Sequence, residues 1–145
     1  FGSQFKRGQA CGINNHLNYG YAIVRAAIAR ALVQYGWLPA LGLFHKSELN
    51  PFNLADDFIE PYRPIVDLMV WHLHDQGRLK ENLTPNAKQQ LVAILNQQIC
   101  LDQQTFSVLA AIDRTIASFQ ISLADKNAKL LKLPGILPLK EHQYE

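Results

Sequence analysis

The chain has 145 residues, of which 48% are apolar and 18% are charged, and its formal net charge is +2. This length fits a single domain, and the chain is too apolar and too weakly charged to be disordered. No run of 18 apolar residues occurs, so the sequence predicts no membrane-spanning helix. The weakly basic charge neither requires nor excludes a nucleic-acid partner.

The sequence begins at Phe1, and its single methionine is Met69, so we interpret the chain as a fragment of a longer protein. Its first residues do not show the basic and then apolar pattern of a secretory signal. The two cysteines, Cys11 and Cys100, are far apart and belong to no CxxC motif. We therefore expect reduced thiols in a cytoplasmic protein.

The first third of the chain reads as a linker, a long helix and a connection. Residues 1–12 are rich in Gly and Gln without periodicity and are expected to form a linker or loop. From Ile13 the spacing predicts a helix that is capped by Asn14 and ended by Gly36. Its expected buried stripe consists of Leu17, Tyr21, Val24, Ile28, Ala31 and Tyr35. Residues 37–52 contain prolines and a glycine and are expected to form a connection.

A second helix is expected to start at an Asn53 cap and to end at Gly77. Pro61 and Pro64 lie inside this pattern, and each would cost about 3 kcal/mol in a regular helix interior. The sequence therefore predicts a kink or break there. The expected core positions are Leu54, Phe58, Tyr62, Ile65, Met69 and Leu73.

Thr84 followed by Pro85 predicts the start of a third helix over about residues 85–99. A fourth helix is expected from about Phe106 to about residue 127. No window alternates like a strand, so we predict an all-α fold with a helical domain over 13–133 and an irregular tail over 134–145.

The densest polar cluster lies at the predicted kink. Asp56, Asp57 and Glu60 share one helix face, and their mutual repulsion favours a cation, either Arg63 or a divalent metal. Together with His45 from the preceding connection, they are typical ligands for Mg²⁺ or Mn²⁺. The simpler alternative is that the acidic residues complement the helix dipole and form ordinary surface pairs.

A second arrangement is His45, then His74 and Asp75, then Asp113, in the order of ligands in HD-type metal phosphohydrolases, which are also all-α. Four common residues in order form a weak signal, and a solvated helix end explains His74 and Asp75 more simply. His16 is expected on a helix surface.

Basic residues are scattered along the chain, and some flank the acidic cluster. Four of them are candidates for contacts with DNA phosphates near this cluster: Lys6, Arg7, Lys46 and Arg63. Solubilising surface charge is the alternative for each.

Three segments resemble the universal CRISPR adaptation integrase family, with the type II branch the closer match. They are NYGYAIVR at 18–25, LGLFH at 41–45 and FNLADDFIEPYRPIVD at 52–67. The resemblance implies a two-domain protein whose N-terminal β-rich domain is absent here, so that this chain is most of the helical C-terminal domain. It also implies homodimers, a small partner subunit and double-stranded DNA as the substrate.

The resemblance implies one metal ion, Mg²⁺ or Mn²⁺, held by His45, Glu60 and a further glutamate, with Asp57 at a supporting or ligating position. The further glutamate has no counterpart in this chain. The implied reaction is phosphoryl transfer in which a 3′-hydroxyl of a foreign DNA fragment attacks the edge of a CRISPR repeat. We expect this fragment to be inactive alone. A non-catalytic helical module that binds DNA or a protein is the alternative.

Overall fold

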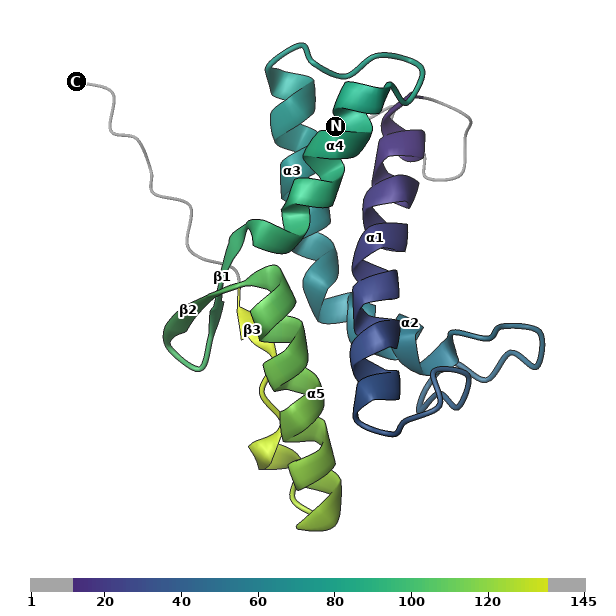
Figure 1. The fold of residues 1–145 in the computed structure, drawn as a ribbon, viewed down its shortest axis with the longest axis vertical. Helices are drawn as coiled ribbons and strands as arrows, with labels where there is room; N and C mark the ends of the chain where they lie inside the picture. Colours follow the sequence, from purple (N-terminus) through teal and green to yellow (C-terminus); the bar gives the residue numbers. More distant parts are fainter. Residues whose placement is uncertain (1–11, 136–145) are drawn as a thin grey trace.

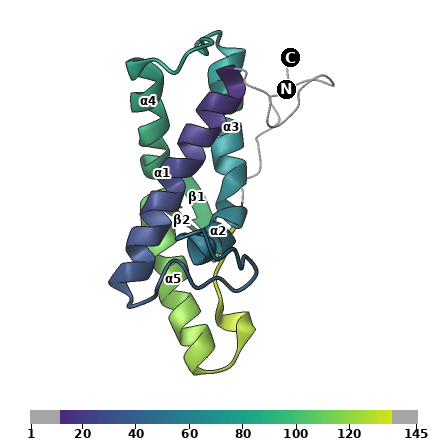
Figure 2. The ribbon, with the colours of Figure 1, turned by 90° about the vertical axis from the view of Figure 1, so that its right-hand side faces the viewer.

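The computed structural model describes residues 12–135, which are mostly helical. The helices are α1 (Gly12–Gln34), α2 (Asn53–Ile59), α3 (Arg63–Asp75), α4 (Pro85–Val92) and α5 (Val108–Ala124). The longest helix, α1, contacts all four others. Figures 1 and 2 show α1, α3 and α4 side by side in one half of the molecule, with α5 extending into the other half.

The buried face of α1 confirms most of the predicted stripe, because Leu17, Val24, Ile28 and Ala31 are buried. Two predictions for this helix are wrong. Because α1 begins at Gly12, Asn14 lies inside its first turn and is not the cap. His16 is fully buried instead of lying on the surface, and its Nδ1 contacts the Gly12 carbonyl oxygen at 2.5 Å.

The predicted kink is a 3₁₀ turn, η1 (Glu60–Tyr62), between α2 and α3. Pro61 lies in this turn, and Pro64 lies in the first turn of α3, where a missing N–H is tolerated. Beyond the turn the buried positions are Val66, Val70 and Leu73. The predicted Ile65 and Met69 are only half-buried at the margin of that face.

A small sheet corrects the expectation that no strand occurs. The third helix predicted from the sequence is α4, and it ends at Val92. A 3₁₀ turn, η2 (Ala93–Asn96), then leads into β1 (Gln98–Leu101) and β2 (Gln104–Ser107). Asp102 and Gln103 both have positive φ, which closes a tight two-residue hairpin. The antiparallel order is β2-β1-β3, where β3 (Pro134–Gly135) pairs with Cys100 and Leu101. Figure 1 shows this sheet beside the start of α5.

Other predicted helix ends are confirmed. The Thr84 hydroxyl accepts a hydrogen bond from the Ala87 N–H at 3.2 Å and caps α4. Gly36 and Gly77 have φ of +83° and +65°, which is the left-handed conformation that favours glycine after a helix. A last short 3₁₀ turn, η3 (Ala128–Leu130), follows α5.

The expected linker, apart from Gly12, and most of the expected tail lie outside the described residues, and so do Lys6, Arg7 and Cys11. Within residues 12–135, no helix combines the length and the apolar character needed to cross a membrane.

Candidate metal centre

The connection between α1 and α2 is held in place by the first residue of α2. Asn53 is not the predicted cap; it is a buried anchor inside the helix. Its side-chain amide donates to the carbonyl oxygens of Ala40 at 3.0 Å and Ser47 at 2.7 Å, and its oxygen accepts from the Ser47 N–H at 3.3 Å. One amide therefore fixes both arms of the loop that carries His45.

Asp57, one turn further along α2, holds the centre of the same loop. Its Oδ2 accepts the N–H groups of Leu43 at 2.6 Å and Phe44 at 3.1 Å. Its Oδ1 accepts the His45 N–H at 3.1 Å and contacts the His45 ring Nδ1 at 2.7 Å. Burial by itself raises the pKa of Asp57, but these four hydrogen bonds outweigh burial and hold the pKa below its ordinary 3.8. Asp57 is therefore a carboxylate whose lone pairs are already directed at the loop.

This contact orients the imidazole of His45. A carboxylate only accepts hydrogen bonds, so Nδ1 is the ring nitrogen that donates to Asp57. In the neutral ring the lone pair then lies on Nε2, which is the arrangement that orients metal-binding histidines in general. The His45 side chain is 38% exposed, whereas that of Asp57 is 10% exposed. The imidazole is therefore both oriented and accessible.

Glu60 stands at the joint between α2 and α3, and its side chain is half-exposed. Its Oε1 pairs with Arg63 Nε at 3.2 Å. Residues 12–135 contain no group of three His, Cys, Asp or Glu side chains placed to hold a metal ion together. The structure thus brings His45 to Asp57 and Glu60 to Arg63, but it does not assemble a three-ligand centre from described residues. Lys46 is exposed in the loop beside His45.

The HD-type arrangement is not formed. His45 lies in the loop before α2, His74 and Asp75 end α3, and Asp113 lies on α5, and these residues form no candidate metal cluster among those described. Asp113 instead accepts a hydrogen bond from the Tyr35 hydroxyl at 3.3 Å. Burial and this neighbouring carboxylate together raise the pKa of Tyr35. The order of these residues in the sequence therefore does not reflect proximity in the fold.

A hollow of about 260 Å³ lies between α1 and the α2–α3 joint. It is lined by Asn18, Tyr21, Ala22, Arg25, Asp56, Ile59 and Arg63. Arg25 was not among the site residues predicted from the sequence. The signal was present, because Asn18, Tyr21, Ala22 and Arg25 have the i, i+3, i+4, i+7 spacing of one helix face.

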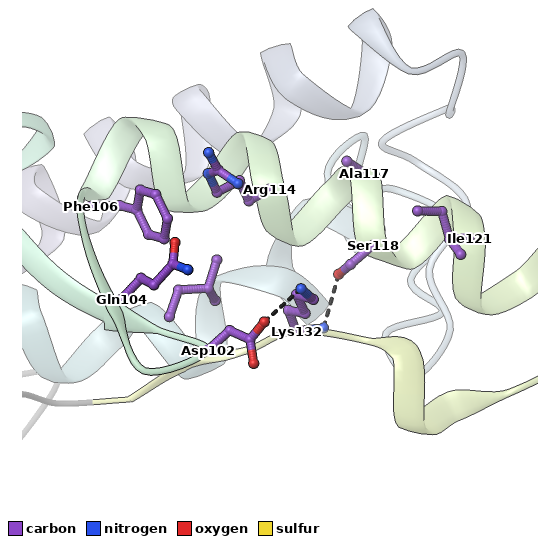
Figure 3. Close-up of a pocket in the computed structure, with 9 residues that line it drawn as sticks. Asp102, Gln104, Phe106, Arg114, Ala117, Ser118, Ile121 and Lys132 are labelled. Atoms are coloured by element: carbon purple, nitrogen blue, oxygen red, sulfur yellow. Dashed lines mark hydrogen bonds and ion pairs between the residues drawn. The ribbon is translucent and has the colours of Figure 1, made fainter.

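A second hollow, of about 290 Å³, lies between the β1–β2 hairpin and α5 and contains none of the predicted site residues. Figure 3 shows Arg114 near Phe106 at one end and the Asp102–Lys132 pair on the side opposite α5. The Arg114 guanidinium carbon is 4.2 Å from the centre of the Phe106 ring. Lys132 Nζ is 2.6 Å from Asp102 Oδ2.

The sequence matches the family model described as "CRISPR associated protein Cas1" over residues 1–100. The chain belongs to the Cas1 family. This confirms the family resemblance of the three sequence segments, and it leaves no support for the HD-type alternative. The mostly helical fold agrees with the predicted class apart from the small sheet.

Two Cas1 relatives show how much of a curated family member this chain covers. It is 63% identical over 145 residues to the CRISPR-associated endonuclease Cas1 of Neisseria meningitidis serogroup C (strain 8013), covering all of this chain and 48% of that protein. It is 31% identical over 100 residues to "CRISPR-associated endonuclease Cas1 1" of Francisella tularensis subsp. novicida (strain U112), covering 68% of this chain and 31% of that protein. The chain thus spans at most about half the length of these curated relatives.

A solved structure described as "Casposase bound to integration product" superposes with a TM-score of 0.71 at 25% sequence identity. The match covers 92% of this chain and 39% of that chain. Nearly the whole fold described above therefore recurs as a part of a larger protein.

Proposed function

We propose that this chain supplies the helical half of a metal-dependent Cas1 endonuclease and integrase that inserts foreign DNA into a CRISPR array. Within it, His45 through Nε2 and Glu60 through its carboxylate hold one Mg²⁺ or Mn²⁺. The observation that supports this assignment best is the His45–Asp57 contact, which fixes Nδ1 and leaves the lone pair of the neutral ring on Nε2 of a partly exposed side chain. When bound, the metal would polarise a DNA phosphodiester and stabilise the charge that develops on it.

In this proposal Asp57 positions His45 and is not itself a ligand. Both of its oxygens already accept two hydrogen bonds each from the loop. Direct coordination would have to displace backbone donors that hold the loop in place. The donor set of one imidazole and carboxylates suits Mg²⁺ and Mn²⁺.

The third ligand in this proposal is the glutamate that the family resemblance places before Phe1. The 145-residue chain alone is therefore expected to show no metal-dependent DNA cleavage. Double-stranded DNA, a second copy of the protein, a small partner subunit and a cytoplasmic location belong to the same proposal.

The test is a chimera in which these 145 residues replace the matching half of the Neisseria relative. We expect Mg²⁺- or Mn²⁺-dependent strand transfer into a CRISPR repeat, abolished by EDTA and by His45→Ala or Glu60→Gln. His74→Ala is the matched control and should retain activity. Strand transfer that survives either ligand substitution, or its absence from the unsubstituted chimera, would overturn the proposal in favour of a non-catalytic binding module.

A further inference from the structure

The hollow between α1 and the α2–α3 joint presents two arginines that no comparison assigns to a role. Arg25 comes from α1 and Arg63 from the start of α3, and both line the same space. Their side chains are 39% and 44% exposed, so both arginines are partly accessible to solvent. Two such groups at one hollow suit a ligand with several anionic oxygens.

Each guanidinium is held against an aromatic ring. The Arg25 guanidinium carbon is 4.9 Å from the centre of the Phe52 ring, and that of Arg63 is 5.1 Å from the centre of the Tyr21 ring. Tyr21 is fixed in turn because its hydroxyl donates to Asp67. Stacking of this kind restricts the rotamers of the arginines, so less conformational entropy is lost when they bind an anion.

The neighbouring carboxylates use only some of the hydrogen-bond donors of the two arginines. Arg63 uses Nε for Glu60, and the four N–H groups on its two terminal nitrogens are not part of that contact. Arg25 approaches Asp56 through Nη1 at a loose 3.7 Å. Asp56 also accepts a hydrogen bond from the Asn50 amide at 2.7 Å, which further offsets its charge. Both arginines therefore line the hollow with donors that these carboxylate contacts do not use.

We propose that Arg25 and Arg63 together bind one backbone phosphate of the DNA substrate, next to the proposed metal ligand Glu60. This deepens the proposed function and rests on it for the identity of the anion. DNA is favoured over a free small anion because the hollow is open to solvent along a helix face and adjoins the carboxylate assigned to the metal. The same arginine, Arg63, thereby links phosphate binding to the position of Glu60.

The test measures binding of fluorescent double-stranded DNA to the 145-residue chain by anisotropy in EDTA, so that no metal site is needed. Arg25→Gln and Arg63→Gln should each weaken binding about 5- to 10-fold and lower the slope of log affinity against log salt by about one. Arg114→Gln is the matched control, because Arg114 is also stacked on an aromatic ring at the edge of a hollow. It should leave the affinity within twofold.

Asp56→Asn tests whether Arg25 binds phosphate or only stabilises the fold through its pair with Asp56. It removes the carboxylate and keeps the guanidinium of Arg25, so DNA affinity should hold or rise. Phosphates are then replaced one at a time by neutral methylphosphonates. At the contacted position this replacement should weaken DNA binding by the unsubstituted chain but not by the Arg25→Gln, Arg63→Gln double variant. Thermal melts of every variant confirm that it is folded.

Equal losses of DNA affinity in all three Arg→Gln variants would show that only the net charge of the chain matters, and this would overturn the proposal. Absence of DNA binding by the unsubstituted chain, or loss of binding on Asp56→Asn, would also overturn it. These outcomes are distinct from failure of the proposed function. The chimera could lack metal-dependent strand transfer while the two arginines still bind DNA as described.

Discussion

The side chains of His45 and Asp57 meet across the loop–helix boundary, with 2.7 Å between Nδ1 and Oδ1. The residue that carries the candidate ligand and the residue that orients it are twelve positions apart. Asp57 also accepts the backbone N–H groups of Leu43, Phe44 and His45 itself. The orientation of the imidazole is thus coupled to the conformation of the loop backbone.

Asp57→Asn should lower the free energy of unfolding by about 1–3 kcal/mol, because a charged acceptor of four hydrogen bonds becomes a neutral amide that accepts at one atom only. Urea denaturation in EDTA measures the effect. Asp56→Asn is the control and should cost less, since Asp56 is bound by side chains and not by the loop backbone. A larger loss for Asp56→Asn would contradict the anchoring role of Asp57.

In the chimera, Asp57→Asn should weaken Mn²⁺ binding about 10- to 100-fold without abolishing it, as expected for a residue that orients a ligand. His45→Ala should have the larger effect, because it removes the ligand itself. Titration followed by Mn²⁺ electron paramagnetic resonance compares the two variants. If Asp57→Asn weakens binding as much as His45→Ala does, Asp57 is itself a ligand.

Gly20→Ala should destabilise the chain by about 1–3 kcal/mol although alanine is the better helix former. A Cβ at this position would lie 2.6 Å from Cγ1 of Val66, a stiff and fully buried side chain on α3. Adding Val66→Ala should recover part of the loss caused by Gly20→Ala, and a double-mutant cycle measured by urea unfolding reports this coupling. Strict additivity would show that α1 and α3 do not meet here.

Tyr62→Phe should cost about 1 kcal/mol at neutral pH, because it leaves the buried Thr115 hydroxyl without its 2.8 Å partner. It should also change how the free energy of unfolding falls at alkaline pH. Burial raises the pKa of Tyr62 well above its ordinary 10.0. The folded state therefore keeps a proton that the unfolded state releases, and the stability contributed by Tyr62 is lost as pH rises above about 10.

Urea unfolding at several pH values between 8 and about 11 compares the two chains. The unsubstituted chain should lose stability more steeply than Tyr62→Phe above about pH 10. Parallel curves would mean that the phenol of Tyr62 is not buried as described.

The sequence predicted the helices well where a long stripe or an end signal was present, as in α1 and at Thr84. It missed the sheet because each strand is at most four residues long and its hairpin depends on positive φ at Asp102 and Gln103, which are not glycines. It also misplaced His16, since a lone polar residue carries no sign of which face it occupies. On α3, Val66 is buried opposite Gly20 of α1, and periodicity alone does not contain that contact between helices.

In the candidate site, too, some features could be predicted from the sequence and others depend on the fold. The acidic cluster and His45 stood out by residue type and, with the family resemblance, pointed to a metal. The distinct roles of Asp57 and Asn53 could not be read from the sequence, because both depend on a loop without periodicity folding back onto α2. Arg25 could have been predicted from the sequence, because its spacing from Asn18, Tyr21 and Ala22 places it on the same helix face.

The attachment of the loop to α2 also bears on how the molecule opens. The amides of Leu43, Phe44 and His45 are tied to a helix side chain, so their hydrogen exchange should follow the opening of α2 and be slower than that of an ordinary surface loop. Asn53 ties the neighbouring stretch to the same helix. Fraying of the first turns of α2 would therefore release the loop and disorient the imidazole in a single cooperative event.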